Sequence, residues 1–319
     1  MDLTEDELIA AIGRVLSGAG PEVLVGPGDD AAVVRGGSGE LVLTTDAMVE
    51  GVHFLTDRTT PRDLGYKAIA VNVSDIAAMA GSPRFALCAL TLTDEIDASW
   101  VVELAGGMRE CCDEFAVSLV GGNLSRGDEL AIVVTVTGEV GPGRAVRRDG
   151  ARPGDRVVVT GFLGGSAAGL RVSSQRSWSD DERDALRRTM RPVPRVGEAS
   201  ILSAHGATAM MDVSDGLTID LSRLCRASGV GARVEVGHVP VHPASTVQEA
   251  LGGGEDYELL ATLPGSDAVA SVAKVVHEGF GVSLTDIGAI IEGESGGLVG
   301  VDEDGTERPL AIEGWDHFR

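Results

Sequence analysis

The sequence contains few of the residues on which several common enzyme classes depend. It has only two lysines, Lys67 and Lys274, and neither follows a glycine as the lysine of a P-loop does. It also lacks the HRD and DFG motifs of protein kinases, the G-x-S-x-G motif of serine hydrolases and the HExxH motif of zinc proteases. These absences exclude the mechanisms that those motifs carry.

Cysteines and long apolar segments are also scarce. The four cysteines show no C-x-x-C spacing, and the adjacent pair Cys111 and Cys112 is badly placed to form a disulfide, so we expect reduced thiols that mostly pack. No stretch approaches the roughly 18 continuous apolar residues of a membrane span. The opening segment carries acids where a signal peptide needs a basic start. These features predict a cytoplasmic protein.

Basic charge is the third scarcity. Lys and Arg total 26 against 49 Asp and Glu, which gives a formal net charge of −23. This charge repels nucleic acid and anionic membranes over most of the surface, so neither is an expected partner. If the protein binds phosphates, divalent cations must offset its carboxylates. The composition is otherwise that of a folded protein, with 43% hydrophobic and 24% charged residues.

The length and the periodicity of the chain predict two domains. A chain of 319 residues is too long for one ordinary core, and the pattern lapses into glycine, proline and charge at about 140–155. We expect an α/β (α+β) fold with an N-terminal mixed-sheet domain at 1–145 and a C-terminal α/β domain at 146–319. The expected helices are at about 4–17, 63–81, 100–115, 164–172, 180–190, 215–228 and 267–279. The expected strands are 40–45 (ending on Asp46), 85–92, 117–123 (buried), 129–140, 156–161, 233–236, 257–263 and 282–291.

Oxygen-bearing side chains recur in short motifs along the whole chain. Carboxylates and hydroxyls are the hard donors that Mg²⁺ prefers, but each motif also fits an Asx-turn, a strand end, a solvated helix face or a helix N-cap. At the motif around Ser214 and Asp215, either of these two residues is a candidate N-cap, and the same geometry would aim free backbone N–H groups at a phosphate. The motifs are Gly28-Asp29-Asp30, Thr44-Thr45-Asp46, Asp75 and Asp212-Val213-Ser214-Asp215.

Two further motifs have features of phosphate sites. Gly121-Gly122-Asn123 follows a predicted strand and permits close backbone approach to a ligand, although glycine pairs more often form a turn. Arg144, Arg147 and Arg148 form the densest basic cluster of an acidic chain. Guanidinium groups suit bidentate phosphate binding, and a solvated loop between domains is the alternative.

Three residues are candidates for contact with an organic substrate. Glu255, within GGGEDY, belongs either to a flexible turn or to a loop that presents its carboxylate to a cation. His53 is by default a hydrogen-bonded structural histidine. Trp315, near the C-terminus, either packs or offers a platform for a flat cation. None of these three is informative alone.

The order of the motifs is more specific than any one of them. GDDAA, TTD, EGVHF, DLGYKAIAVNVSDIAAM, GGN, GRAVRRDGARPGD, VTGFLGGSAAGL, DVSDG, GGEDYELL and GWDHF span residues 26–318. In this order they resemble the thiamine-monophosphate kinase family of the aminoimidazole ribonucleotide synthetase superfamily. The resemblance implies Mg²⁺-dependent, in-line transfer of the γ-phosphoryl group of ATP to thiamine monophosphate. It also implies a homodimer whose first domains pair, with an α/β second domain completing each site.

The resemblance also implies roles for individual residues, without a general base. At Asn123 the family usually has an aspartate that binds Mg²⁺, so that metal site is expected to be weaker or to use another acid such as Asp128. The implied substrate contacts are His53, Glu255 and Trp315, and the implied ATP contacts are Gly121, Gly122, Arg148 and Ser214. The implied metal ligands are Asp30, Thr44, Thr45, Asp46, Asp75, Asn123, Asp212 and Asp215.

Two alternatives to this function remain open at the level of sequence. One is an ATP-dependent synthetase or another small-molecule kinase of the same superfamily, which would share the ATP and metal motifs. EGVHF, GGEDYELL and GWDHF argue against it. The other is a regulator that binds Mg²⁺ and nucleotide without catalysis, which a turnover assay distinguishes from an enzyme.

Overall fold

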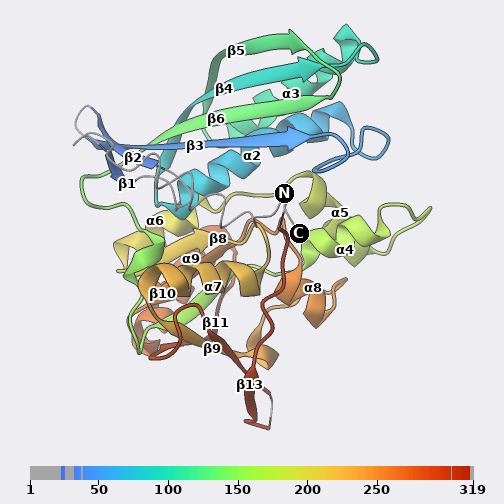
Figure 1. Cartoon of the computed structure of the whole chain (residues 1–319). Helices are drawn as coiled ribbons and strands as arrows, with labels where there is room; N and C mark the ends of the chain where they lie inside the picture. Colours follow the sequence, from blue (N-terminus) through green and yellow to red (C-terminus); the bar gives the residue numbers. More distant parts are fainter. Residues whose placement is uncertain (1–22, 26–31, 37–38, 303, 317–319) are drawn as a thin grey trace.

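The computed structural model describes residues 23–25, 32–36, 39–302 and 304–316. Its strands form two separate sheets, and helices pack against both (Figure 1). The elements of the first half are β1 (Val23–Val25), β2 (Ala32–Gly36), β3 (Gly39–Val49), α2 (Pro61–Ala78), β4 (Ser82–Leu92), α3 (Ala98–Glu114), β5 (Ser118–Arg126) and β6 (Ala131–Val140). Those of the second half are η1 (Arg148–Gly150), β7 (Arg156–Thr160), α4 (Gly165–Val172), α5 (Asp180–Met190), α6 (Val196–Ala204), β8 (Ala209–Asp212), α7 (Leu217–Ser228), β9 (Gly231–Glu235), η2 (Val236–His238), α8 (Val247–Gly252), β10 (Leu259–Leu263), α9 (Ser266–Phe280), β11 (Leu284–Ile291), β12 (Leu298–Val301) and β13 (Glu307–Pro309).

The first sheet has six strands in the order β1-β2-β3-β6-β4-β5. Neighbouring strands are antiparallel except β4 and β5, which run parallel. Successive side chains of β6 alternate between buried and half-exposed, because a strand presents them to opposite faces in turn. The buried face packs against α2 and α3, and Ile132 and Val134 share one core with Leu64 and Leu104. This sheet is therefore covered by helices on one face.

The second sheet has seven strands in the order β13-β12-β9-β11-β7-β10-β8, with only β9 and β12 parallel. Both of its faces are covered. Val157 shares a core with Leu221 of α7, whereas the next residue, Val158, shares a different core with Leu202 of α6. Burial on both faces explains why β7 reads as an apolar run rather than an alternating strand.

Helix α2 lies between the two halves (Figure 1). Thr60 caps its N-terminus by accepting a hydrogen bond from the Asp63 N–H (3.1 Å), and Pro61 occupies its first position. Every residue from 64 to 74 is buried. One side of α2 packs on the first sheet and α3, and the other contacts α6 and β8 of the second half. This helix is therefore in contact with both halves along most of its length.

Most of the expected elements are confirmed, and two expectations differ from the structure. Strand β3 does not end on Asp46, because its pairing with β6 continues to Val49. The strand expected to be buried, β5, is exposed throughout, because it forms the edge of the first sheet and no helix among the described residues covers it. The weakly amphipathic α6, the short α8 and the strands β1, β2, β8, β12 and β13 were not predicted. The helix expected at 4–17 lies outside the described residues.

The four cysteines are buried and free, in agreement with the expected packing role. Burial raises the pKa of the Cys88 thiol to about 11 and that of Cys225 to about 12, which keeps both protonated at neutral pH. Within the part of the chain that the structure describes, no helix combines the length and apolar character needed to cross a membrane.

Candidate active site

Acidic side chains from both halves of the chain converge beside α2. Asp46 lies on β3. Asp75, on α2, accepts a hydrogen bond from the Thr44 hydroxyl (Oγ1 to Oδ2, 2.6 Å). Asp212, the buried last residue of β8, accepts one from the Ser74 hydroxyl (Oγ to Oδ2, 2.5 Å). Two adjacent residues of α2 therefore bring together groups from β3 and β8.

Tyr257 lies near four of these acids. Burial raises the pKa of its hydroxyl well above the usual range, and the charges of Glu255, Asp46, Asp212 and Asp75 raise it further. Each carboxylate acts in this direction because it disfavours a second negative charge nearby. We call these four residues (Asp46, Asp75, Asp212 and Glu255) the acid cluster.

The loop at residues 252–257 holds Glu255 in place by unusual backbone geometry. Glu255 has a φ of +65° and Tyr257 a φ of +51°, values that residues other than glycine rarely adopt. Their backbone N–H groups donate to the carbonyls of Ser214 (2.7 Å) and Val213 (2.9 Å), respectively. The Glu255 carboxylate pairs with Lys67 of α2 (Nζ to Oε1, 2.8 Å). The loop is thus fixed to the DVSDG segment and to α2.

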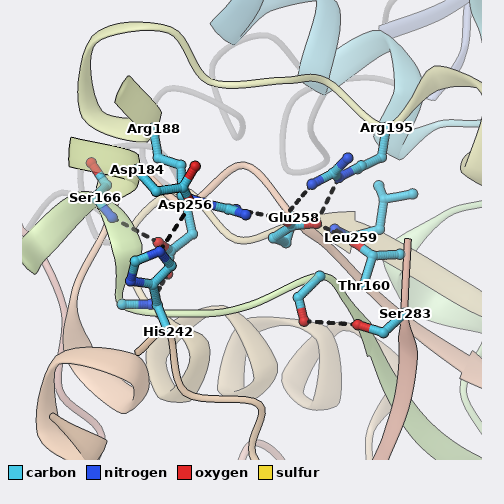
Figure 2. Close-up of polar contacts among 12 residues, drawn as sticks. Thr160, Ser166, Asp184, Arg188, Arg195, His242, Asp256, Glu258, Leu259 and Ser283 are labelled. Atoms are coloured by element: carbon cyan, nitrogen blue, oxygen red, sulfur yellow. Dashed lines mark hydrogen bonds and ion pairs between the residues drawn. The ribbon is translucent and has the colours of Figure 1, made fainter. Parts of the chain in front are cut away.

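The next acids of the same segment anchor it on the other side (Figure 2). Asp256 accepts hydrogen bonds from two backbone N–H groups at the start of α4, those of Gly164 (2.6 Å) and Ser166 (3.2 Å). Burial raises the pKa of Asp256 to about 7, although these two bonds act to lower it. Glu258 accepts two hydrogen bonds from the Arg195 guanidinium (2.6 and 2.7 Å). These buried contacts are a rigid base for the loop.

The start of α7 differs from the sequence-based expectation. Its N-cap is Gly216, not Ser214 or Asp215, and no side chain caps it in the usual way. Instead, the carboxylate of Asp220 accepts the backbone N–H groups of Ser214, Asp215 and Gly216 at 3.0 to 3.1 Å. These three N–H groups are therefore bonded within the chain rather than free, whereas the expected phosphate contact at this turn stays a prediction.

Several predicted ligand contacts gather around this turn. Asp215 forms an ion pair with Arg223, which also bonds Asp220 (3.0 Å). Burial and the charge of Asp215 raise the pKa of Asp220 to about 7, whereas Arg223 and Arg148 act to lower it, which locates Arg148 nearby. The backbone N–H of Trp315 donates to the Asp215 carbonyl (3.0 Å), and Trp315 is 52% exposed. The turn thus groups a cation, an acid and an exposed aromatic ring.

The predicted Gly-Gly-Asn motif lies on the exposed edge strand β5, not in a turn. Gly121, Gly122 and Asn123 pair with Leu87, Cys88 and Ala89 of β4. A Cβ on Gly122 would lie only 1.7 Å from the carbonyl oxygen of Cys88, so the neighbouring backbone requires glycine there.

The remaining predicted residues are less closely connected to the cluster. The Thr45 hydroxyl donates to the Val134 carbonyl of β6 (3.1 Å), and its side chain is exposed. His53 lies in the turn after β3, where its Nδ1 accepts the Val49 N–H (3.1 Å), so a neutral ring carries its proton on Nε2. Asp30 lies outside the described residues.

The comparisons with known proteins show which family the chain belongs to. The family models described as AIR synthase related protein, N-terminal domain and C-terminal domain, match residues 28–140 and 152–301. The thiamine-monophosphate kinase of Escherichia coli (strain K12) is 38% identical over 309 residues, and the match covers 93% of each chain. The chain belongs to the thiamine-monophosphate kinase family.

Other members of the thiamine-monophosphate kinase family show the same extent of similarity. The thiamine-monophosphate kinase of Bacillus subtilis (strain 168) is 36% identical over 307 residues, covering 92% of this chain and 94% of the relative. A solved structure described as AaThiL complexed with AMPPCP and TMP matches with a TM-score of 0.86 and 34% identity, covering 100% of this chain and 99% of that one. The mixed α/β fold expected from the sequence is therefore confirmed as the fold of this family.

The acid cluster offers carboxylate oxygens of the kind that Mg²⁺ prefers, but it does not form a closed cage. Within the described ranges, no three side chains of Asp, Glu, His or Cys lie close enough together to hold a metal ion. Mg²⁺ typically takes one or two carboxylates and completes its shell with water and substrate phosphates. The donors present therefore fit Mg²⁺ that is bound together with phosphates, rather than a preformed metal centre.

Four residues of the site were missed by the sequence analysis, namely Lys67, Ser74, Asp220 and Tyr257. Lys67 had a detectable signal, because it is a charged residue in a helix that is otherwise apolar, as is Asp75. Asp220 lies one turn inside a helix, where nothing in the sequence distinguishes it from a solvated acid. The roles of Ser74 and Tyr257 depend on residues far away in the sequence, such as Asp212.

A cavity of about 450 Å³ lies apart from the acid cluster. Arg144 and Arg147 line it together with Glu40 and Asp149, whereas Arg148 and the four acids of the cluster do not. Arg147 is paired with Asp149 (Nε to Oδ1, 2.9 Å). The basic cluster read from the sequence therefore divides between two places, and only Arg148 lies at the start of α7.

Proposed function

We propose that this protein is a thiamine-monophosphate kinase, which transfers the γ-phosphoryl group of ATP to thiamine monophosphate and yields thiamine diphosphate and ADP. One observation carries the proposal: α2 joins carboxylates of both halves at one place, next to the loop that carries Glu255. Family membership supports the substrate pair. The solved relative bound to AMPPCP and TMP supports ATP as the phosphoryl donor.

Both reactants are polyanions, so transfer requires positive charge between them. Mg²⁺ would supply that charge and would align the attacking and leaving oxygens. Asp46, Asp75 and Asp212 would hold it, joined by Asp30, Thr44, Thr45, Asn123 and Asp215 in the full set of proposed ligands. The hydroxyls of Thr44 and Ser74 fix the orientation of the carboxylates that they bond. No general base is proposed, because a phosphate nucleophile is ionised near pH 7.

Distinct groups are proposed to bind the two substrates. Arg148 and Ser214, at the start of α7, would contact ATP, as would the backbone at Gly121 and Gly122. Glu255 would attract the cationic thiazolium ring, and the exposed face of Trp315 would stack on it by a cation–π interaction. His53 completes the proposed contacts with thiamine monophosphate.

The active form is proposed to be a cytoplasmic homodimer, with a domain boundary at 145/146 in each chain. The exposed apolar face of β4 and β5 supports pairing of the first domains: Leu87, Val120 and Leu124 are 48%, 59% and 68% exposed. An uncovered edge strand with apolar side chains is a ready surface for another sheet. Pairing at β5 would also enclose the Gly-Gly-Asn motif, which one chain leaves exposed.

The test is to incubate the protein with Mg²⁺-ATP and one acceptor at a time: thiamine monophosphate, thiamine, or an aminoimidazole precursor. Mass spectrometry of the products should show thiamine diphosphate with the first acceptor only. A phosphorylated product from another acceptor would favour a different kinase or synthetase of the superfamily. Binding of Mg²⁺-ATP with no ADP formation in the presence of thiamine monophosphate would instead favour a non-catalytic regulator.

A further inference from the structure

Lys67 is a buried ammonium group that the proposed reaction does not yet use. It lies in the second turn of α2, and its side chain is 6% exposed. Its Nζ is 2.8 Å from Oε1 of Glu255, whose side chain is 35% exposed. An ammonium is unfavourable in a buried position unless an opposite charge compensates it. The pair therefore has one partner fixed in the interior and one that reaches solvent.

The backbone at Glu255 needs such a restraint. Glu255 and Tyr257 both have positive φ, and three glycines precede them, so the segment has strained and flexible residues side by side. The hydrogen bond from Glu255 N–H to the Ser214 carbonyl fixes the main chain. The bond from Lys67 fixes the carboxylate, and it comes from a helix of the other half of the chain.

One face of α2 orients carboxylates at two places. Lys67 and Ser74 are seven residues apart, so they lie on the same side of the helix, separated by roughly 10 Å along its axis. Ser74 bonds Asp212 at one place, and Lys67 bonds Glu255 at the other. A substrate with a phosphate at one end and a cationic ring at the other also carries its two charges at separate places. Its phosphate end would face the Asp212 site, and its ring would face the Glu255 site.

We propose that Lys67 is a specificity-determining positioning residue, which holds Oε1 of Glu255 so that the other carboxylate oxygen faces the cationic ring of the substrate. The proposal rests on the proposed function. Lys67 itself does not touch the substrate and acts through Glu255. It also offsets part of the repulsion between Glu255 and the three aspartates of the acid cluster. Recognition of the cation therefore requires both residues, whereas recognition of ATP requires neither.

The test is a double-mutant cycle with K67M, E255Q and K67M/E255Q, measured by steady-state kinetics. Each single variant should raise the KM for thiamine monophosphate about tenfold, with kcat changed less than about threefold. The KM for ATP should not change. The KM for thiamine monophosphate of the double variant should be no more than about tenfold above that of the wild type. Once Lys67 is lost, Glu255 is no longer held in position, so losing Glu255 as well costs little more. A phosphate-ester analogue with a neutral ring should discriminate little between wild type and variants.

The matched control is K274M, which removes an exposed lysine of α9 and should behave like wild type (Lys274 is 74% exposed). K67R should partly restore the KM, because it keeps the positive charge. Circular dichroism and thermal unfolding check that each variant folds. If K67M does not fold, K67Q takes its place in the cycle, because it leaves a polar group at the buried end.

Two results would overturn the proposal. One is a double variant whose KM rises by about the product of the single effects, roughly 100-fold, because independent residues multiply. The other is a change in kcat with no change in the KM for thiamine monophosphate, or an equal rise in the KM for ATP. Failure of the proposed function is distinguishable, because then the wild-type protein itself makes no thiamine diphosphate, and the inference falls with it.

Discussion

Asp75→Asn should separate the stability of this protein from its activity. The asparagine has nearly the same shape as aspartate, and its side-chain carbonyl can still accept the hydrogen bond from the Thr44 hydroxyl (2.6 Å in the wild type). What the substitution removes is one negative charge among the acid cluster. Its effects should therefore be those of charge alone, with opposite signs for folding without Mg²⁺ and for catalysis.

The magnitudes follow from the surroundings of Asp75. By Coulomb's law at an effective dielectric constant of 20, two unit charges repel by about 3 kcal/mol at about 5 Å and by about 1.7 kcal/mol at about 10 Å, and less where solvent screens them. Asp75 is only partly buried, so we expect the variant to gain about 1 to 2 kcal/mol of unfolding free energy in EDTA. Catalysis should lose about 10²-fold or more in kcat, which corresponds to about 2.7 kcal/mol of transition-state stabilisation.

The assay combines thermal unfolding with and without Mg²⁺-ATP and steady-state kinetics at saturating Mg²⁺. The melting temperature in EDTA should rise by a few degrees, and the additional rise on adding Mg²⁺-ATP should be smaller than in the wild type. Asp267→Asn, in the exposed first turn of α9, is the matched control, and it should change neither the turnover rate nor the melting temperature. Turnover near the wild-type value would refute the role of Asp75 as a Mg²⁺ ligand. A lower melting temperature in EDTA would refute the repulsion within the acid cluster.

Three further predictions follow from other parts of the structure. Asn123→Asp should lower the Mg²⁺ concentration needed for half-maximal activity, because it adds a charged ligand; an unchanged Mg²⁺ titration would show that position 123 is not a ligand. Leu124→Lys should dissociate the proposed dimer in sedimentation experiments, because Leu124 is 68% exposed on the edge strand β5, whereas Val102→Lys on α3 (69% exposed) should not. Sedimentation of the Leu124 variant as an intact dimer would exclude β5 as the interface. Burial raises the pKa of Asp256 from 3.8 to about 7, so the native state binds the extra proton, and unfolding free energy should fall by up to about 4 kcal/mol as pH rises from 4 to 7. Asp256→Asn should remove that part of the pH dependence in denaturant unfolding, and an identical pH profile would contradict the assignment.

The sequence alone predicted several of the elements that hold the site, although not β8, which carries Asp212. Helix α2 and strands β6 and β7 follow from periodicity, from Pro61 and from turn residues, which act over a few neighbouring residues. The acidic composition already required divalent cations at any phosphate site. The order of the motifs was enough to indicate the family.

The geometry of the site could not be read from the chain in the same way. Ser74 and Asp212 are 138 residues apart, and their contact depends on how α2 packs against β8. The sequence also could not show that Asp220 satisfies the N–H groups predicted to bind phosphate. Nor could it show that β5 lies at an uncovered edge, because its apolar residues are equally consistent with burial.

Local sequence therefore determined the secondary structure and the kind of chemistry, and tertiary structure decided which groups meet. The reason is physical: a turn or a helix depends on contacts within a few residues, whereas an ion pair depends on the relative position of whole elements. The pairing of Lys67 with Glu255 illustrates the difference. The sequence showed only a rare lysine in an apolar helix, and the fold gave it a partner at the site.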